Sequence, residues 1–312
     1  MIRFILKRLW YGLLVLFGVI TVVFLLFNIL PGDPARMMLG QRADIASVEA
    51  INRDLGLDKP AHIQYFSFLN DLSPISFHNN ADSLNYWYYN TEKYSGLELV
   101  GIGQSAVYLK YPYLRRSYQS QRKVSEILAE AFPKTMLLAG VSILFALIFG
   151  VGIGILVAVN KNIFIEKLAL VFSVLGMSIP SFFAAILMAW VFAYLLGEYT
   201  GLNMFGSLYA VDDYGKGEFL ELKNLILPAL TLGIRPLAIV VELTRSSLLE
   251  VMSQDYIRTA RAKGLSKFRI IARHALKNAL NPVITAVSGW FASLMAGAVF
   301  VEYVFDWKGI GV

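Results

Sequence analysis

Long apolar stretches separated by shorter polar segments dominate the pattern of the chain. Five of them stand out, over residues 10–30, 135–159, 168–196, 225–243 and 283–304. A helix needs about 20 apolar residues to cross the hydrocarbon core of a bilayer, so each stretch is long enough to span it. The pattern predicts an all-α polytopic membrane protein with five transmembrane helices.

Polar residues and prolines inside these stretches are expensive in a membrane and therefore informative. The fourth stretch is interrupted by Pro228, Pro236 and two ionisable residues, Arg235 and Glu242, which we interpret as the ionisable groups of the spans. They are seven residues apart, two helical turns on one face. In the third stretch Pro180 predicts a kink. All three polar or kinked positions fit either a transport pathway or ordinary structural contacts.

Glycines within the spans predict close helix contacts, because helix association in lipid depends on close packing. In the second stretch these are Gly140, Gly150, Gly152 and Gly154. Gly289 and Gly297 play the corresponding part in the fifth stretch.

Composition supports a membrane protein. Hydrophobic residues make up 57% of the chain and charged residues 16%, with a mean hydropathy of +0.58, outside the range of soluble domains. The chain has no cysteine, which excludes disulfides, thiolate catalysis and cysteine metal sites.

Lysine and arginine gather in particular flanks of the spans. They occur before the first span, between the second and third, and throughout the loop 246–281, whereas the loop 197–224 is mainly acidic. The positive-inside rule therefore places the N-terminus and the basic loop in the cytoplasm. The net charge of +6 is mostly this topology signal, so no nucleic-acid partner is expected. The first apolar run lacks a small-residue cleavage site, so we interpret it as a retained helix and not a signal peptide.

The basic loop has the pattern of two short helices. In the first, the apolar or small residues Leu249, Met252, Tyr256 and Ala260 share one face, and Gly264 is a natural C-terminal stop. The small residues Ala260 and Gly264 would allow a close backbone approach.

The second helix is expected to begin after Ser266 as its N-cap. One predicted face carries Phe268, Ala272, Ala275 and Ala279. The other is a basic stripe at i, i+4 spacing, formed by Arg269, Arg273 and Lys277. Positive-inside charge alone is the competing interpretation. A nucleic-acid-binding helix-turn-helix is excluded because membrane helices tether the segment closely on both sides.

These residues resemble the cytoplasmic coupling loop of ABC importer permeases. Aligned on Gly264, the chain matches the general Glu-Ala-Ala pattern strictly only at Ala260, Gly264 and Leu276. The sequences YIRTARAKGL (256–265) and RHALKNAL (273–280) instead resemble the dipeptide, oligopeptide and nickel branch, of the oligopeptide permease B type. LPGDPARMMLG and VEYVFDWKGIGV, at 30–40 and 301–312, agree, so the resemblance covers nearly the whole chain.

The resemblance implies a permease subunit of an ATP-driven importer with the type I fold of six transmembrane helices. Five are present, and the helix that follows the 301–312 motif in the family is expected but missing. The implied partners are a second homologous permease, two ABC ATPase subunits and an extracytoplasmic substrate-binding protein, in a bacterial inner membrane. The coupling residues that it implies are Tyr256, Arg258, Thr259, Ala260, Arg261, Ala262, Lys263, Gly264 and Leu265.

The chain is expected to divide into a transmembrane helix (1–30), an extracytoplasmic loop (31–123) and a permease core (124–312) containing the coupling loop. Within the second part, residues 54–69 are expected to be largely helical, and residues 73–121 form an aromatic-rich insertion that favours a small folded cap over disorder. The tyrosine and tryptophan cluster at 86–89 fits either a membrane-interface belt or a docking surface for the binding protein.

The chemistry absent from the sequence limits its function. There is no GxxxxGK[ST] phosphate loop, so ATP and Mg²⁺ are expected on partner subunits. His62, His78 and His274 are too scattered for a metal site, and no HExxH or GxSxG motif occurs, so no metal, bound cofactor or catalytic residue is expected. An ion-coupled secondary transporter would show internal repeats, which we do not find. The cargo is expected to be a di- or oligopeptide, with nickel or another small solute as the alternative.

Overall fold

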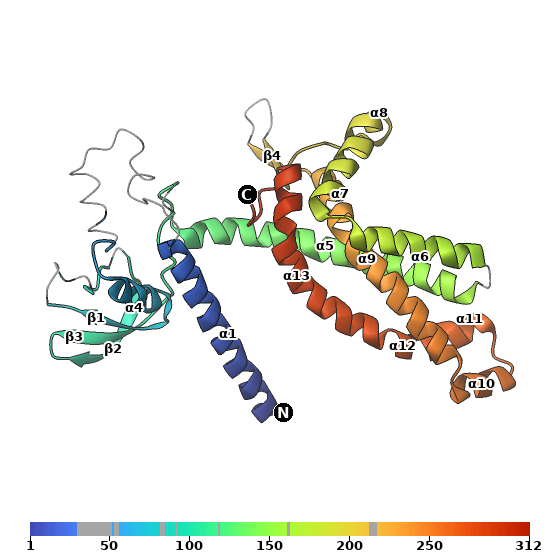
Figure 1. The fold of residues 1–312 in the computed structure, drawn as a ribbon, viewed down its shortest axis with the longest axis horizontal. Coiled ribbons are helices and arrows are strands. Elements are labelled where there is room, and N and C mark those ends of the chain that lie inside the picture. The colour runs from blue at the N-terminus through green and yellow to red at the C-terminus, as the bar shows by residue number, and fades with distance from the viewer. Residues whose placement is uncertain are drawn as a thin grey trace. The chain divides into compact units, whose positions relative to one another are not determined.

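The computed structural model describes residues 1–29, 52, 56–81, 85, 87–91, 93–117, 119–160, 163–211 and 217–312. The chain forms two compact units, Met1–Ile127 and Leu128–Val312 (Figure 1). Each unit is considered separately.

The first unit joins a membrane-length helix to a small α/β domain. Helix α1 (Ile2–Ile29) is followed by α4 (Ala61–Leu72) and three antiparallel strands. The strands are β1 (Ile75–Asn79), β2 (Gly96–Ile102) and β3 (Ser105–Lys110), in the order β1-β3-β2. A two-residue loop joins β2 to β3, and Gly103 at its first position has φ +63°, as a type II′ hairpin requires.

The insertion is thus a folded domain, as its aromatic content indicates, although strands were not predicted. The predicted helix over 54–69 is partly wrong, because residues 56–59 form a turn and the helix begins only after Pro60. Gly56 has φ +69°, a conformation that ends regular helix, and Pro60 is extended. Residues 54 and 55 lie outside the described residues.

Aromatic rings form the interior of this domain. His78 is 1% exposed and lies within 6 Å of the rings of Tyr89, Tyr94 and Tyr108. Tyr89 stacks on Tyr108 with ring centroids 3.9 Å apart. These tyrosines therefore support the fold, and Tyr89 of the predicted cluster is half-buried with its ring against Tyr108. Tyr86 lies outside the described residues, whereas Trp87 and Tyr88 are half-buried.

A buried carboxylate links α4 to the sheet. Asp71, 5% exposed, accepts hydrogen bonds from the Tyr94 hydroxyl at 2.7 Å and from Arg115 Nε at 2.9 Å. Lys110 Nζ donates to the Asp71 backbone carbonyl at 2.6 Å. A buried charge is tolerated only when paired and hydrogen-bonded, and this one is. Burial, with the neighbouring Asp71 charge, raises the pKa of Tyr94, so its hydroxyl stays a donor.

Helix α4 also packs against α1. The hydroxyls of Thr21 and Tyr65 are 2.7 Å apart, and the ring of Phe24 lies 5.1 Å from Tyr65 and 5.7 Å from Phe68. The contact is therefore made by the C-terminal third of α1.

The second unit is almost entirely helical. Helix α5 (Val124–Val159), which begins at the end of the first unit, runs through it and is followed by α6 (Ile163–Ser178) and α7 (Ser181–Met188). A π-helical segment η1 (Ala189–Leu195), the short helix α8 (Gly197–Thr200) and a hairpin of β4 (Tyr209–Val211) and β5 (Glu218–Leu220) come next. Two long helices, α9 (Lys223–Met252) and α13 (Asn281–Phe305), enclose the basic loop.

Four described helices are long and apolar enough to cross a membrane, namely α1, α5, α9 and α13. The predicted third span is a pair of helices bent by 110° between Ser178 and Ser181. Pro180 lies in this break in an extended conformation, and a proline cannot donate the backbone hydrogen bond that would continue the helix. The predicted kink is therefore a complete break. Pro228 and Pro236 do not break their helix, because α9 continues through both.

Helices α5 and α9 approach each other closely through two glycines. A Cβ at Gly150 would lie 2.8 Å from a Val240 methyl, and one at Gly154 would lie 2.6 Å from Thr244 Cβ and 2.9 Å from the Val241 carbonyl. The other predicted contact glycines are Gly140, Gly152, Gly289 and Gly297. Each has open space where a Cβ would be, so the prediction of a close helix contact is wrong for these four within the described chain. For Gly152 the spacing explains the result, because it is two residues from both Gly150 and Gly154 and therefore points to another side of the helix.

We expect Gly154→Ala to lower the thermal stability of the protein, since the added methyl group meets backbone and a β-branched side chain. Overpacking of this kind costs about 1–3 kcal/mol. Gly152→Ala is the matched control, because the same methyl meets nothing within 4 Å there. The measurement is the melting temperature of both purified variants in one detergent. Equal melting temperatures would contradict the proposed contact.

A second prediction concerns pH. Burial, with a contribution from the Lys110 charge, lowers the pKa of His78 below its usual 6.5. Above that value His78 is neutral in both folded and unfolded chains. As the pH falls below it, the unfolded chain binds the proton first, so the sheet loses stability between the ordinary pKa and the lowered one.

The measurement is hydrogen–deuterium exchange of β1 and β3 peptides at pH 7 and pH 5, corrected with unfolded peptides. Protection is expected to fall at pH 5 in the parent and to change less in His78→Gln. The same pH dependence in both proteins would assign the effect to another group.

Candidate functional site

The basic loop folds as a compact hairpin at the end of α9. Its first helix, α10 (Asp255–Ala262), is separated from α9 by a turn at Ser253 and an extended Gln254. The predicted continuous helical face from Leu249 to Ala260 is therefore wrong, because it crosses this break. The inward side of α10 consists of Ile257 (0% exposed) and Ala260, whereas Tyr256 is exposed.

Gly264 ends α10 as predicted. Its φ is +74°, and the Leu265 amide bonds to the Ala260 carbonyl while the Gly264 amide bonds to Arg261. This pair of hydrogen bonds is the Schellman motif, which favours glycine at that position. A Cβ at Gly264 would meet nothing within 4 Å, so the predicted close backbone approach is absent within this chain. Gly264 is required for its backbone conformation.

The second helix of the hairpin begins at Ser266, whose hydroxyl accepts from the Arg269 amide at 3.4 Å. Helix α11 (Lys267–Arg269) continues into a π-helical segment η2 (Ile270–Ala275) and α12 (Leu276–Ala279). The π turn changes which residues face inward, because its hydrogen bonds join residues five apart instead of four.

The predicted apolar stripe is consequently half right. Ala275 and Ala279 are fully buried, but Phe268 is 81% exposed and Ala272 is exposed. Ile270 and Ile271 are buried in their place. The signal in the sequence for this inward face was the adjacent pair of isoleucines, which do not fall on the i, i+4 stripe used for the prediction.

A small apolar core holds the hairpin to the helices that carry it. Buried residues from α9, α10 and the second hairpin helix meet there, namely Leu248, Ile257, Ala260, Ile270, Ala275 and Ala279. Asn278 Nδ2 donates to the Tyr256 hydroxyl at 2.9 Å across the hairpin, and Lys267 Nζ lies 3.4 Å from the Val159 carbonyl at the end of α5. The hairpin is therefore attached to the ends of both α5 and α9.

The outer surface of the hairpin is basic. Arg269, Arg273 and Lys277 are all exposed, and no salt bridge joins them to an acid within the described part of the chain. The remaining predicted coupling residues are also exposed and lie on α10 or just after it, namely Arg258, Thr259, Arg261, Ala262 and Lys263; Leu265 is half-buried against the hairpin core. The arrangement presents positive charge and one exposed phenylalanine, Phe268, away from the helices.

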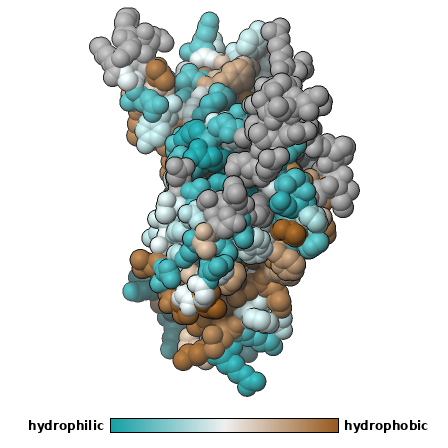
Figure 2. Space-filling view, turned by 90° about the vertical axis from the view of Figure 1, so that its left-hand side faces the viewer, coloured by the Kyte–Doolittle hydropathy of each residue, from teal (hydrophilic) through white to brown (hydrophobic). Residues whose placement is uncertain are grey.

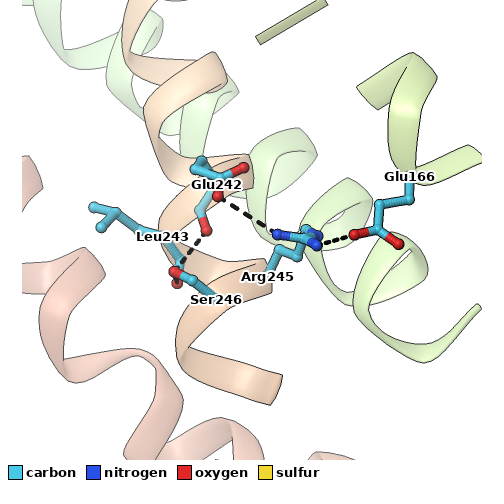
Figure 3. Close-up of polar contacts among 5 residues, drawn as sticks. All are labelled: Glu166, Glu242, Leu243, Arg245 and Ser246. Carbon is cyan, nitrogen blue, oxygen red and sulfur yellow. Dashed lines mark hydrogen bonds and ion pairs between the residues drawn. The ribbon is translucent and has the colours of Figure 1, made fainter. Parts of the chain in front are cut away.

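An ionic cluster lies just before the hairpin (Figure 3). Arg245 of α9 bonds to Glu166 in the first turn of α6 and lies 3.6 Å from Glu242 on its own helix. The Arg245 side chain is 19% exposed. Sequence reasoning missed Arg245, although its i, i+3 spacing from Glu242 is a signal for such a pair.

Arg235 and Glu242, which were expected to make either structural contacts or part of a pathway, each have a structural contact. Glu242 pairs with Arg245, and the guanidinium of Arg235 lies 5.5 Å from the centre of the Trp290 ring of α13. This cation–π contact joins α9 to α13. Pro180 is the break between α6 and α7.

Glu302 is an ionisable residue of the fifth span that the sequence analysis overlooked. It is fully buried and accepts hydrogen bonds from Thr135 Oγ1 at 2.6 Å and from the Gly311 amide at 2.8 Å. The Ile310 amide donates to the same Thr135 hydroxyl at 2.9 Å, and Gly309 leaves no room for a Cβ beside this carboxylate. The 301–312 motif therefore folds its last residues onto α5 and α13.

Within the described residues, no three His, Asp or Glu side chains are grouped as metal ligands. The arrangement presents an exposed basic surface connected to long helices, and its ionic contacts join those helices to one another.

Known proteins are similar to this chain over its whole length. Residues 150–312 match the family described as binding-protein-dependent transport system inner membrane component, and residues 1–78 match its N-terminal region. The glutathione transport system permease protein of Salmonella typhimurium is 34% identical over 311 residues, covering 100% of this chain and 85% of that protein. The Escherichia coli K12 protein of the same name is 33% identical with the same coverage. A solved structure of the methionine ABC transporter MetNI, in an inward-facing conformation, matches 60% of this chain and 78% of its own, with a TM-score of 0.45 and 17% identity.

We expect Arg245→Glu to lower the melting temperature, because Glu166, Glu242 and the new carboxylate would then repel one another. Adding Glu166→Arg should restore part of the loss by reversing the pair. Since the groups are partly exposed, the coupling free energy between the two positions should be about 1 kcal/mol. A double-mutant cycle of melting temperatures measures it, and strictly additive effects would show that the α6–α9 pair contributes nothing.

Proposed function

Because the chain belongs to the family of binding-protein-dependent transport system inner membrane components, we propose that it imports di- or oligopeptides as one of two permease subunits. The family is that of ABC importer permeases, and the observed spans agree with the all-α, type I fold predicted for the membrane part. Its members are transport subunits of the inner membrane and not catalytic enzymes; ATPase and binding-protein partners follow from that class.

The peptide cargo is supported by the relatives. The curated proteins that match the whole chain are permeases for glutathione, which is itself a small peptide. The YIRTARAKGL and RHALKNAL segments point to the same branch, which also contains nickel importers. Nickel or another small solute is therefore the alternative cargo, and competition by di- and tripeptides for uptake would distinguish them.

The exposed basic hairpin is the observation on which the mechanism rests. We place it in the cytoplasm, with the N-terminus, from the distribution of lysine and arginine. Tyr256 to Leu265 and the basic stripe would occupy a groove on one of two ATPase subunits, where ATP and Mg²⁺ bind. A second homologous permease would complete the pathway, and the domain between α1 and α5 would lie outside, beside the binding protein.

The internal contacts explain how movement of the hairpin would reach the membrane. Its core includes Leu248, so α10 cannot shift without α9. Arg245 connects α9 to α6, and α6 ends at the break beside Pro180. Closure of the ATPase subunits would thus move α9 and α6 together as rigid elements, changing access to the pathway. In this mechanism Arg245 is a positioning residue, whereas Arg235 and Glu242 are assigned structural contacts with Trp290 and Arg245.

The test replaces the basic stripe with the triple variant Arg269→Gln, Arg273→Gln and Lys277→Gln. Each exposed contact contributes below about 1 kcal/mol, so single changes should be nearly silent. Together they should weaken ATPase co-purification and ATP-driven peptide uptake, and the difference from the parent should shrink as the salt concentration rises, because salt screens the charge contacts that only the parent makes.

A matched control removes three exposed or half-exposed positive charges from the other unit, at Lys59, Lys93 and Arg116, and should leave ATPase binding unchanged. If the stripe variant assembled and transported like the parent at every ionic strength, the stripe would be only a topology signal.

A further inference from the structure

The sheet of the first unit has an unusual distribution of polarity. On its inner face lie Ser76, His78, Tyr108 and Lys110, all buried. Its outer face consists of two rows of apolar residues across the three strands. The strand register pairs Ile75 with Leu109 and Leu97 in one row, and Phe77 with Val107 and Val100 in the other.

Most of these apolar side chains are exposed in the part of the chain that the structure describes. Exposure is 59% for Ile75, 46% for Phe77, 74% for Leu97, 57% for Val100 and 47% for Leu109. Figure 2 shows brown apolar surface in the lower half of the view, where Figure 1 draws both the sheet and the apolar helix α1. No charged residue occurs in either row. A contiguous apolar face of this kind marks an interaction surface.

The contacts of α4 indicate where this face lies. Counting about 20 residues onward from Arg8 places the outer limit of the hydrocarbon core near the end of α1. Thr21 is eight residues before that end, about 12 Å along the helix axis. Since Tyr65 bonds to Thr21 and Phe68 packs on Phe24, α4 lies at the depth of the outer leaflet.

The apolar face continues from this membrane contact. Only Ser73 and Pro74 separate α4 from the first strand, so Ile75 begins the sheet directly beside the helix that touches α1. Phe66 of α4 is 57% exposed, and Tyr111, one residue beyond β3, is 81% exposed. Aromatic residues at the ends of an apolar surface are typical of proteins that meet the membrane interface.

From this placement we propose that the outer face of the β1-β3-β2 sheet lies on the outer leaflet of the membrane, with Ile75, Phe77, Leu97, Val100 and Leu109 among the lipid acyl chains. A soluble partner that binds and leaves fits the face less well, because such interfaces carry polar groups and a hydrogen bond about every 100–200 Å². The inference rests on α1 spanning the bilayer, as in the proposed function. It assigns the domain an anchoring role on the membrane surface.

The experiment uses single introduced cysteines, which are unique because the chain has none. Leu97→Cys and Val100→Cys carry a nitroxide label on the apolar face, and Glu98→Cys, exposed on the same strand, is the matched control. The full chain is reconstituted in vesicles of phosphatidylcholine and phosphatidylglycerol. Electron paramagnetic resonance then compares collision of the label with oxygen, which partitions into lipid, and with a water-soluble nickel chelate.

We expect labels at 97 and 100 to show a higher oxygen-to-nickel collision ratio than the label at 98. Equal ratios at all three positions would leave the face in water and overturn the inference. Protection of 97 and 100 from both reagents would show protein cover and would also overturn it.

Leu16→Cys in the middle of α1 separates this test from that of the proposed function. A lipid-exposed label at 16 with water-exposed labels at 97 and 100 refutes only the anchoring role. A water-exposed label at 16 would refute α1 as a span, and with it the membrane topology on which both proposals depend.

Discussion

The close packing of α5 on α9 is the contact on which the rest of the second unit depends. In lipid, apolar side chains gain little by leaving their solvent, so helices associate through shape and dispersion. Gly150 and Gly154 bring the α5 backbone against Val240, Val241 and Thr244. Helix α9 in turn carries the hairpin, contacts α6 through Arg245 and meets α13 through Arg235. A change in this packing would therefore be felt by every other helix of the unit.

Much of this architecture is predictable from sequence because the membrane imposes simple requirements. Runs of apolar residues locate the spans, and the hairpin is located by Gly264 and Ser266, whose backbone roles are specific to their residue types. The inward face of the second hairpin helix was not predictable by the same reasoning. A π turn has no distinctive composition, so periodicity counted at 3.6 residues selects Phe268 where the structure buries Ile270 and Ile271.

The misses in the polar network have a different cause. Arg235 and Glu242 share a helical face, but Arg235 lies over Trp290 of α13, and Glu242 pairs with Arg245 on its own helix. Arg245 in turn bonds to Glu166 of α6, and sequence spacing carries no information about Trp290 or Glu166. The partners of Glu302 are a threonine 167 residues away and the backbone amide of Gly311, neither of which sequence spacing indicates. The sheet was missed because its buried side is polar and its exposed side apolar, which reverses the alternation usual for a half-buried strand.

The continuity of α9 through its prolines sets the mechanical advantage of the subunit. At 1.5 Å per residue, the helix extends about 26 Å from Val240 to Lys223 but only about 18 Å from Val240 to Met252. If α9 tilts as a rigid rod about its contact with Gly150, its far end travels about one and a half times as far as the end that carries the hairpin. The subunit would thus convert a short, forceful displacement into a longer and weaker one. The ratio of the two displacements is set by the length of α9 on each side of its contact with that glycine.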